Sequence, residues 1–183
     1  IGSGASGRNT QVLRANYNTP ETVSLYRASL QKYRTLSREL DFNVSFTDRG
    51  ELDLCHTPDS LQVEREKSLL NRALGVRTDI LSVDEVLEGF PLVDVTGGGE
   101  LPVVGASYHP PGAFARHDSV VWGYAAAAER RGVSVHQGVT VTGIDVRDGR
   151  CVGVRTDAGP VAAGHVVSAV AGHTSVVAAM AGK

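Results

Sequence analysis

The chain has 183 residues, 42% of them hydrophobic and 21% charged, a mixture typical of a globular domain with an apolar core. Its formal net charge of −2 argues against an electrostatic grip on nucleic acid or on an acidic membrane surface. No apolar run is long enough to span a bilayer and no signal peptide is evident, so we expect a cytoplasmic protein. Cys55, Cys151 and the scattered histidines form no pattern typical of a metal site or a disulfide framework.

The first half of the chain predicts two long helices and several short strands. The apolar spacing predicts a helix from Pro20 to about residue 40, with Thr19 as its N-cap. The stretch "FNVSFTDRGELDLCHT" predicts two short strands with Arg49-Gly50 at the turn, and a second helix follows from Pro58 to a stop at Gly75. In "ILSVDEVLEGFP" we expect a short strand and a short helix that begins with a capping box of Ser82 and Glu85.

The second half predicts one more long helix and then a series of strands. A strand is expected in "LPVVGASY", and a helix capped by Asp118 covers "SVVWGYAAAAERRG". Asp148-Gly149 indicates a hairpin, and "AGHTSVVAAMAG" reads as a loop that passes into a helix. Strands are expected in "VSVHQ", "VTVTGIDVRDG", "RCVGVRTDAG" and "GHVVSAVAG". Because helices and strands mix along the chain, the fold class is predicted to be α/β or α+β.

Both ends of the chain and its first glycines are unusual. Ile1 leads directly into a glycine-rich loop and Lys183 ends the chain near the start of a helix, so we expect an excerpt of a longer polypeptide. Gly2, Gly4 and Gly7 match the spacing of a dinucleotide-binding fingerprint, but no strand precedes them. Three interpretations stay open: a fingerprint, a plain flexible loop, or an anion site with the donors Arg8, Asn9 and Thr10.

Arg14 and His117 are the most informative single residues, and each has two interpretations. Arg14 lies in the apolar stretch "QVLRANY", so its charge needs a partner, which a substrate carboxylate could supply if the side chain is not simply solvated. His117 precedes Asp118 at a helix start, where it could be an ordinary flanking residue or a nucleophile or base.

Three stretches, taken in order, resemble one enzyme family: "GASGRNTQVLRANY", "FARHDSVVWGYAAAAERRGV" and "VTGIDVRDGRCVGVRTDAG" continued by "VVSAVAGHTSVVAAMAG". They are similar to the flavin-dependent amine oxidases of the D-amino-acid oxidase and glycine oxidase superfamily, and most similar to sarcosine oxidase β subunits of the heterotetrameric type. The resemblance runs from Gly4 to Gly182. It implies part of a glutathione-reductase-like FAD-binding domain and part of a mixed-sheet substrate domain. Residues 1–18 would be a flavin-contacting loop and strand, 19–116 mainly substrate domain, and 117–183 the return to the FAD-binding domain.

The same resemblance implies the site residues. Arg14 would hold the substrate carboxylate with Tyr17 nearby, and His117 would carry a covalently attached FMN in addition to noncovalent FAD. The expected FAD contacts are Ser6, Gly7, Arg8, Asn9 and Thr10 in the first loop, Val139 and Thr140 in a strand beside the adenine, and Ala171, Gly172 and His173 near the pyrophosphate. Weak or absent flavin binding is expected in the excerpt itself.

The activity implied for the full-length protein is the oxidation of sarcosine to glycine with formation of hydrogen peroxide. The implied partners are other subunits, one of which would bind tetrahydrofolate. Two alternatives remain: a flavin oxidase or dehydrogenase for another amine such as glycine, dimethylglycine or proline, and a non-catalytic domain that contributes a subunit interface.

Overall fold

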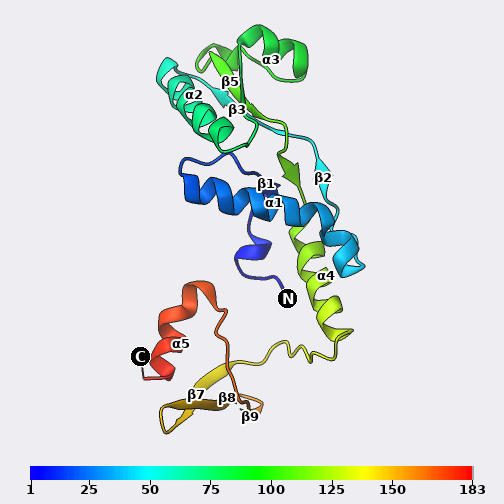
Figure 1. Ribbon diagram of the computed structural model, residues 1–183, viewed down its shortest axis with the longest axis vertical. Helices are drawn as coiled ribbons and strands as arrows, with labels where there is room; N and C mark the ends of the chain where they lie inside the picture. The colour runs from blue at the N-terminus through cyan, green and yellow to red at the C-terminus, as the bar shows by residue number, and fades with distance from the viewer. Residues whose placement is uncertain (183) are drawn as a thin grey trace. The chain divides into compact units, whose positions relative to one another are not determined.

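The computed structural model describes residues 1–182 and divides into two compact units, residues 1–133 and the part that begins at Ser134. Figure 1 shows helices and strands in both units, which confirms the predicted mixture. The first unit contains β1 (Val12–Leu13), α1 (Pro20–Leu40), β2 (Thr47–Asp48), β3 (Glu51–Cys55), α2 (Pro58–Ala73), β4 (Asp79–Leu81), α3 (Val83–Gly89), β5 (Gly105–His109), β6 (Ala113–Phe114) and α4 (His117–Glu129).

Helix α1 links two parts of the core of the first unit. Near its start, Val23 and Leu30 pack in a cluster that includes Ala113 of β6. Near its end, Leu36 and Leu40 pack in a second cluster with residues of α4. Burying a leucine side chain of this kind contributes about 1.5–3 kcal/mol, so this one helix fixes β1, β6 and α4 relative to each other.

The helix boundaries follow the predicted local signals closely. Thr19 accepts a hydrogen bond from the backbone N–H of Thr22, and α2 ends just before Gly75, which has a φ of +74°. The capping box of Ser82 and Glu85 is also present at the start of α3. The structure confirms these predictions. They could be made from the sequence because capping depends on residues that are close in sequence.

The strands on either side of Arg49-Gly50 belong to two different sheets. Strand β2 pairs with β6 in the sheet β1-β6-β2, whereas β3 pairs with β5 in the sheet β3-β5-β4; all these pairs are antiparallel. Gly50 has a φ of +78°, and a Cβ there would lie 2.5 Å from the Tyr108 ring, so the residue must be glycine. The sequence therefore predicted both strands but not the change of sheet between them.

The predicted cap of α4 is wrong. Arg116 holds the N-cap position, and Asp118 is the second residue of the helix. Its carboxylate accepts a hydrogen bond from the Ser119 N–H at 2.8 Å and forms an ion pair with Arg116. The Arg116 side chain competes with the backbone N–H groups of the helix start for the Asp118 carboxylate. A negative charge in the first turn still interacts favourably with the helix dipole.

The second unit is a three-stranded antiparallel meander with one helix: β7 (Val141–Arg147), β8 (Arg150–Thr156), β9 (Gly159–Ala162) and α5 (Thr174–Met180). The Asp148-Gly149 hairpin is confirmed, with φ values of +49° and +73°. The strands expected in "VSVHQ" and "GHVVSAVAG" are wrong, and β9 was not predicted. An apolar run becomes a strand only where a neighbouring strand completes its hydrogen bonds, and neither run has such a partner among residues 1–182.

The two units are defined by contacts within this chain, so the predicted division at residues 18 and 116 stays a prediction. None of the helices formed by residues 1–182 is both long enough and apolar enough to cross a bilayer.

Candidate functional site

The glycine-rich start of the chain forms a single 3-10 turn, Ala5–Gly7, that is followed by β1. The Asn9 side chain closes this loop, since its Nδ2 donates to the Ser6 carbonyl at 2.6 Å and its Oδ1 accepts from the Gln11 N–H at 2.8 Å. A dinucleotide fingerprint requires a helix directly after the loop, whereas here the strand β1 follows. The geometry therefore excludes the fingerprint interpretation of these glycines.

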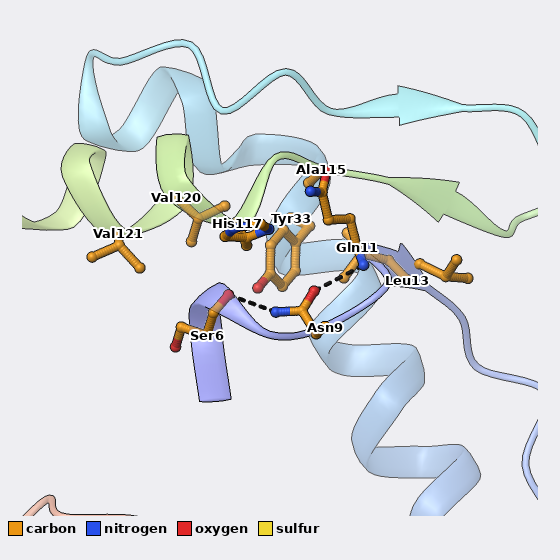
Figure 2. A pocket seen from close by; sticks show the side chains of 10 residues that line it. Ser6, Asn9, Gln11, Leu13, Tyr33, Ala115, His117, Val120 and Val121 are labelled. Carbon is orange, nitrogen blue, oxygen red and sulfur yellow. Dashed lines mark hydrogen bonds between the residues drawn. The ribbon is translucent and has the colours of Figure 1, made fainter. Parts of the chain in front are cut away.

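A pocket of about 120 Å³ joins this loop to the start of α4. Its lining includes Ser6, Asn9, Tyr33, His117, Val120 and Val121, and we call it the His117 pocket. Figure 2 shows the side chains that surround it. Two residues of the predicted FAD loop are thus brought together with the predicted FMN attachment residue, although more than 100 positions separate them in sequence.

The His117 imidazole has an unusual hydrogen-bonding state. Its Nδ1 is buried and has no partner among the described residues. Asp118 does not supply one, because its carboxylate is held by Arg116 through contacts of 3.1 and 2.6 Å, and the hydrogen bond from Arg116 also lowers the pKa of Asp118. A buried polar atom without a partner costs about 1–3 kcal/mol, so this nitrogen is a candidate contact for a ligand.

The remaining loop residues differ in their environments. A Cβ on Gly7 would lie 2.2 Å from the Gly2 carbonyl oxygen, so glycine is required there by the chain itself. Gly4 has a φ of −80° and a Cβ would meet nothing within 4 Å, so its own surroundings do not require glycine. Arg8 and Thr10 are exposed and do not line the His117 pocket.

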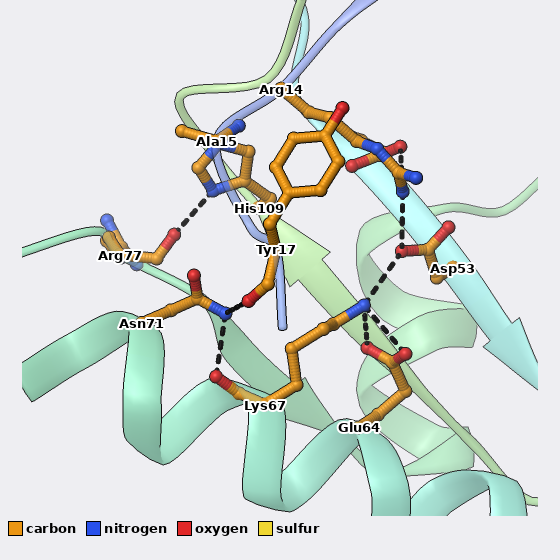
Figure 3. Close-up of polar contacts among 10 residues, drawn as sticks. Arg14, Ala15, Tyr17, Asp53, Glu64, Lys67, Asn71, Arg77 and His109 are labelled. Carbon is orange, nitrogen blue, oxygen red and sulfur yellow. Dashed lines mark hydrogen bonds and ion pairs between the residues drawn. The ribbon is translucent and has the colours of Figure 1, made fainter. Parts of the chain in front are cut away.

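Arg14 is ion-paired with carboxylates of the chain itself. Its Nη1 lies 3.1 Å from Glu51 Oε1 and 3.9 Å from Asp53 Oδ2, and Lys67 bridges Asp53 and Glu64. We call Arg14, Glu51, Asp53, Glu64 and Lys67 the polar cluster; Glu51 and Asp53 lie in β3, and Glu64 and Lys67 in α2. Figure 3 shows Arg14, Asp53, Glu64 and Lys67 of this cluster. The partner that the sequence required for Arg14 is therefore present within the protein.

Glu51 is the least well satisfied member of the polar cluster. Its Oε2 is buried without a hydrogen-bond partner, while Oε1 accepts from Arg14. Burial raises the pKa of Glu51, the charge of Asp53 raises it further, and Arg14 opposes both effects.

Tyr17 lies beside Arg14. The guanidinium carbon is 5.1 Å from the centre of the Tyr17 ring, and this ring stacks on Tyr26 at 4.1 Å. All three residues line a second pocket of about 160 Å³, which shares Tyr33 with the His117 pocket. Burial raises the pKa of Tyr33, so its hydroxyl stays protonated between the two pockets.

His109 is fully buried, and sequence reasoning missed its role. Its Nδ1 donates to the Arg77 carbonyl at 2.7 Å, and its Nε2 accepts from the Ala15 N–H at 3.3 Å. Accepting at Nε2 requires the neutral ring, and burial lowers the pKa of His109 in the same sense. A single histidine at the end of a strand carried no signal, because both partners come from distant parts of the chain.

The other predicted contacts, Val139, Thr140, Ala171, Gly172 and His173, lie in the second unit. Thr140 and Asp157 are joined by two hydrogen bonds, from Thr140 N–H to Asp157 Oδ1 and from Asp157 N–H to Thr140 O. Val139 and Thr140 precede β7, so the strand expected there begins only at Val141. The other three residues form a 3-10 turn before α5. The roles of all five residues stay predictions.

Within residues 1–182, no three His, Cys, Asp or Glu side chains gather closely enough to hold a metal ion. Cys55 and Cys151 are both free thiols.

Comparison with known proteins gives consistent matches over the whole chain. Residues 1–183 match the family model of FAD dependent oxidoreductases. The chain is 37% identical over 183 residues to sarcosine oxidase subunit beta of Arthrobacter sp., and 36% identical over 182 residues to that of Rhodobacter capsulatus. All of this chain is covered in both cases, but only 45% and 44% of the relatives, so the chain spans less than half of their length.

The fold also matches that of a solved structure over the whole chain. The crystal structure of L-proline dehydrogenase from P. horikoshii superimposes with a TM-score of 0.87 at 25% identity, over 100% of this chain and 47% of that one. The family model and the two relatives agree with the resemblance drawn from the three motifs. The chain belongs to the family of FAD-dependent oxidoreductases.

Proposed function

We propose that the full-length protein oxidises the secondary amine sarcosine to glycine, with FAD as the primary acceptor and FMN attached to His117. The relatives named sarcosine oxidase subunit beta support this substrate. When bound, the flavins would accept the hydride equivalent from the N-methyl carbon and pass the electrons to oxygen as hydrogen peroxide. The role of this chain is to hold the flavins and to orient the amine.

The observation that carries the proposal is the unpartnered Nδ1 of His117 in a pocket shared with Ser6 and Asn9. An imidazole with a nitrogen free of hydrogen bonds is available for a covalent bond, whereas one bonded at both nitrogens, such as His109, is not.

The first loop fits a flavin contact for a separate reason. Gly4 leaves an open face where a side chain would meet no atom of the protein, so a ligand can approach the backbone closely. The Arg8 side chain is exposed beside it and offers donors to a phosphate. Ser6, Gly7, Arg8, Asn9 and Thr10 would hold FAD here, with Val139, Thr140, Ala171, Gly172 and His173 as further contacts.

Arg14 and Tyr17 would position the substrate. Their pocket is lined by tyrosine rings and is large enough for a small amino acid. A guanidinium binds a carboxylate through two parallel hydrogen bonds, and the ring faces accommodate a methylated amine. The amine would thereby be oriented through its carboxylate end.

Other subunits complete the proposed enzyme. The relatives are named as subunits, which indicates an assembly of several chains. We expect a partner subunit to bind tetrahydrofolate, which would accept the one-carbon unit released from sarcosine.

The decisive experiment follows flavin through acid denaturation of the full-length protein. Flavin absorbance should stay with the wild-type polypeptide and be lost completely in His117→Ala. The exposed His136 provides a matched control, since His136→Ala should retain the flavin. If the wild-type protein releases all its flavin, the attachment at His117 is wrong.

A second candidate is oxidation of another amine, such as proline, glycine or dimethylglycine. The match to a structure titled L-proline dehydrogenase favours it. Steady-state rates of the full-length enzyme with a panel of these amines would separate the two, because sarcosine should give the highest kcat/KM.

A further inference from the structure

Arg14 is the proposed anchor of the substrate carboxylate, yet in this structure a carboxylate already occupies it. The Glu51 Oε1 accepts a hydrogen bond from Arg14 Nη1 at 3.1 Å. Asp53 contacts the same nitrogen at the longer distance of 3.9 Å. An incoming acid must therefore compete with a group of the protein for this guanidinium.

The bond between Arg14 and Glu51 is weaker than the bond that a substrate acid could make. One carboxylate oxygen meets one guanidinium nitrogen, whereas a free carboxylate can engage two nitrogens in parallel. The Arg14 side chain is also 36% exposed, and it lines the pocket with Tyr17 and Tyr26. An acid can reach the guanidinium from this pocket while Glu51 approaches from β3.

Glu51 itself is poorly held. Its second oxygen is buried and makes no hydrogen bond of good geometry; the buried Asn16 amide beside it lowers the pKa of Glu51 without closing such a bond. Burial and the nearby charge of Asp53 raise the pKa of Glu51, so its charged form is costly. The ammonium group of Lys67 lies 3.7 Å from the Asp53 carboxylate. If Arg14 bound another acid, Lys67 would remain as a positive charge within the polar cluster.

We propose that Glu51 is a resident competitor for Arg14: a substrate carboxylate binds by exchanging with Glu51, and Glu51 thereby sets the affinity of the site for small amino-acid carboxylates. The inference rests on the proposed function in taking Arg14 as the carboxylate anchor. It adds a residue on β3 that controls specificity without contacting the reacting carbon. A neutral ligand has no carboxylate to exchange, so the competition acts only on acids.

The test measures the binding of acetate to the full-length protein by ligand-observed NMR, with acetamide as the uncharged control. Glu51→Gln should lower the dissociation constant of acetate about tenfold, since a hydrogen bond between charged groups is removed from the competing state. Acetamide binding should not change. Asp53→Asn should tighten acetate binding less than Glu51→Gln, because Asp53 lies farther from Arg14 Nη1.

Two further variants keep the result interpretable. Arg14→Gln should abolish the acetate signal, which locates the site. If Glu51→Gln lowers the yield of folded protein, Glu51→Asp should still tighten acetate binding about threefold, because the shorter side chain reaches Arg14 less well. Acetate binding that is absent in all variants, or that stays unchanged or weakens in Glu51→Gln, overturns the proposal. Failure of sarcosine oxidation with intact acetate exchange would instead contradict the proposed function alone.

Discussion

The His117 pocket and the polar cluster lie in the same unit, and the side chain with the proposed role in each, His117 or Arg14, is bonded differently. In the pocket, a histidine nitrogen is buried and left without a partner. In the polar cluster, Arg14 is matched by carboxylates of the chain, and the neighbouring His109 is bonded at both nitrogens. The unpartnered nitrogen of His117 is open to a ligand, whereas a partnered group such as His109 or Arg14 either supports the fold or must exchange its partner.

The largest expected effect is the difference in the free energy of unfolding between variants of the two histidines. His109→Ala should lower the free energy of unfolding by about 2–4 kcal/mol, because the Ala15 N–H and the Arg77 carbonyl lose their partner and a cavity forms. His117→Ala should lower it by less than about 1 kcal/mol, since no hydrogen bond at Nδ1 is lost.

Urea unfolding of the two variants beside the wild-type protein measures both values. Equal losses of stability would show that His117 supports the fold in the same way as His109, and would remove the contrast.

The pH dependence of stability compares the buried His109 with Glu51 of the polar cluster. Burial lowers the pKa of His109, so the unfolded state binds more protons and stability should fall as the pH drops below about 6.5. Burial raises the pKa of Glu51, so the folded state binds more protons and stability should rise as the pH drops toward about 4.3. The two contributions oppose each other in the interval between.

Glu51→Gln should therefore make the loss of stability between pH 6.5 and 5 steeper, by at most about 1.4 kcal/mol per pH unit. Urea unfolding at several pH values gives the slope, and Glu88→Gln on the exposed surface of α3 is the matched control. A shallower slope in Glu51→Gln than in the wild-type protein would contradict the assignment of opposite signs.

The smallest effect on stability is expected at Gly4. Gly4→Ala should change the free energy of unfolding by less than about 0.5 kcal/mol, because the added methyl group meets no atom within 4 Å. The same variant should weaken retention of noncovalent FAD about tenfold, since the methyl group fills the proposed approach to the backbone.

Gly7→Ala is the comparison variant that should disturb the fold of the loop, because its Cβ would clash with the Gly2 carbonyl oxygen at 2.2 Å. Thermal unfolding and flavin release by gel filtration of the full-length protein give both quantities. Normal FAD retention in Gly4→Ala would remove this loop from the flavin site.

Local structure was predictable wherever its causes are close in sequence. The caps of α1, α2 and α3 and the Asp148-Gly149 hairpin follow from residues within one or two turns of each other. Prediction failed where the partner is distant. The two apolar runs without strand neighbours stayed irregular, and Arg116 took the carboxylate that would have capped α4.

For the site, the sequence by itself predicted which residues would carry the chemistry, namely the loop donors, Arg14, Tyr17 and His117, and it indicated the family to which the chain belongs. Tertiary structure alone decided what surrounds them. It placed Glu51 on Arg14, two backbone groups on His109 and none on His117 Nδ1. The reason is physical, because a buried polar atom is satisfied or orphaned only by what long-range packing brings within about 3 Å of it.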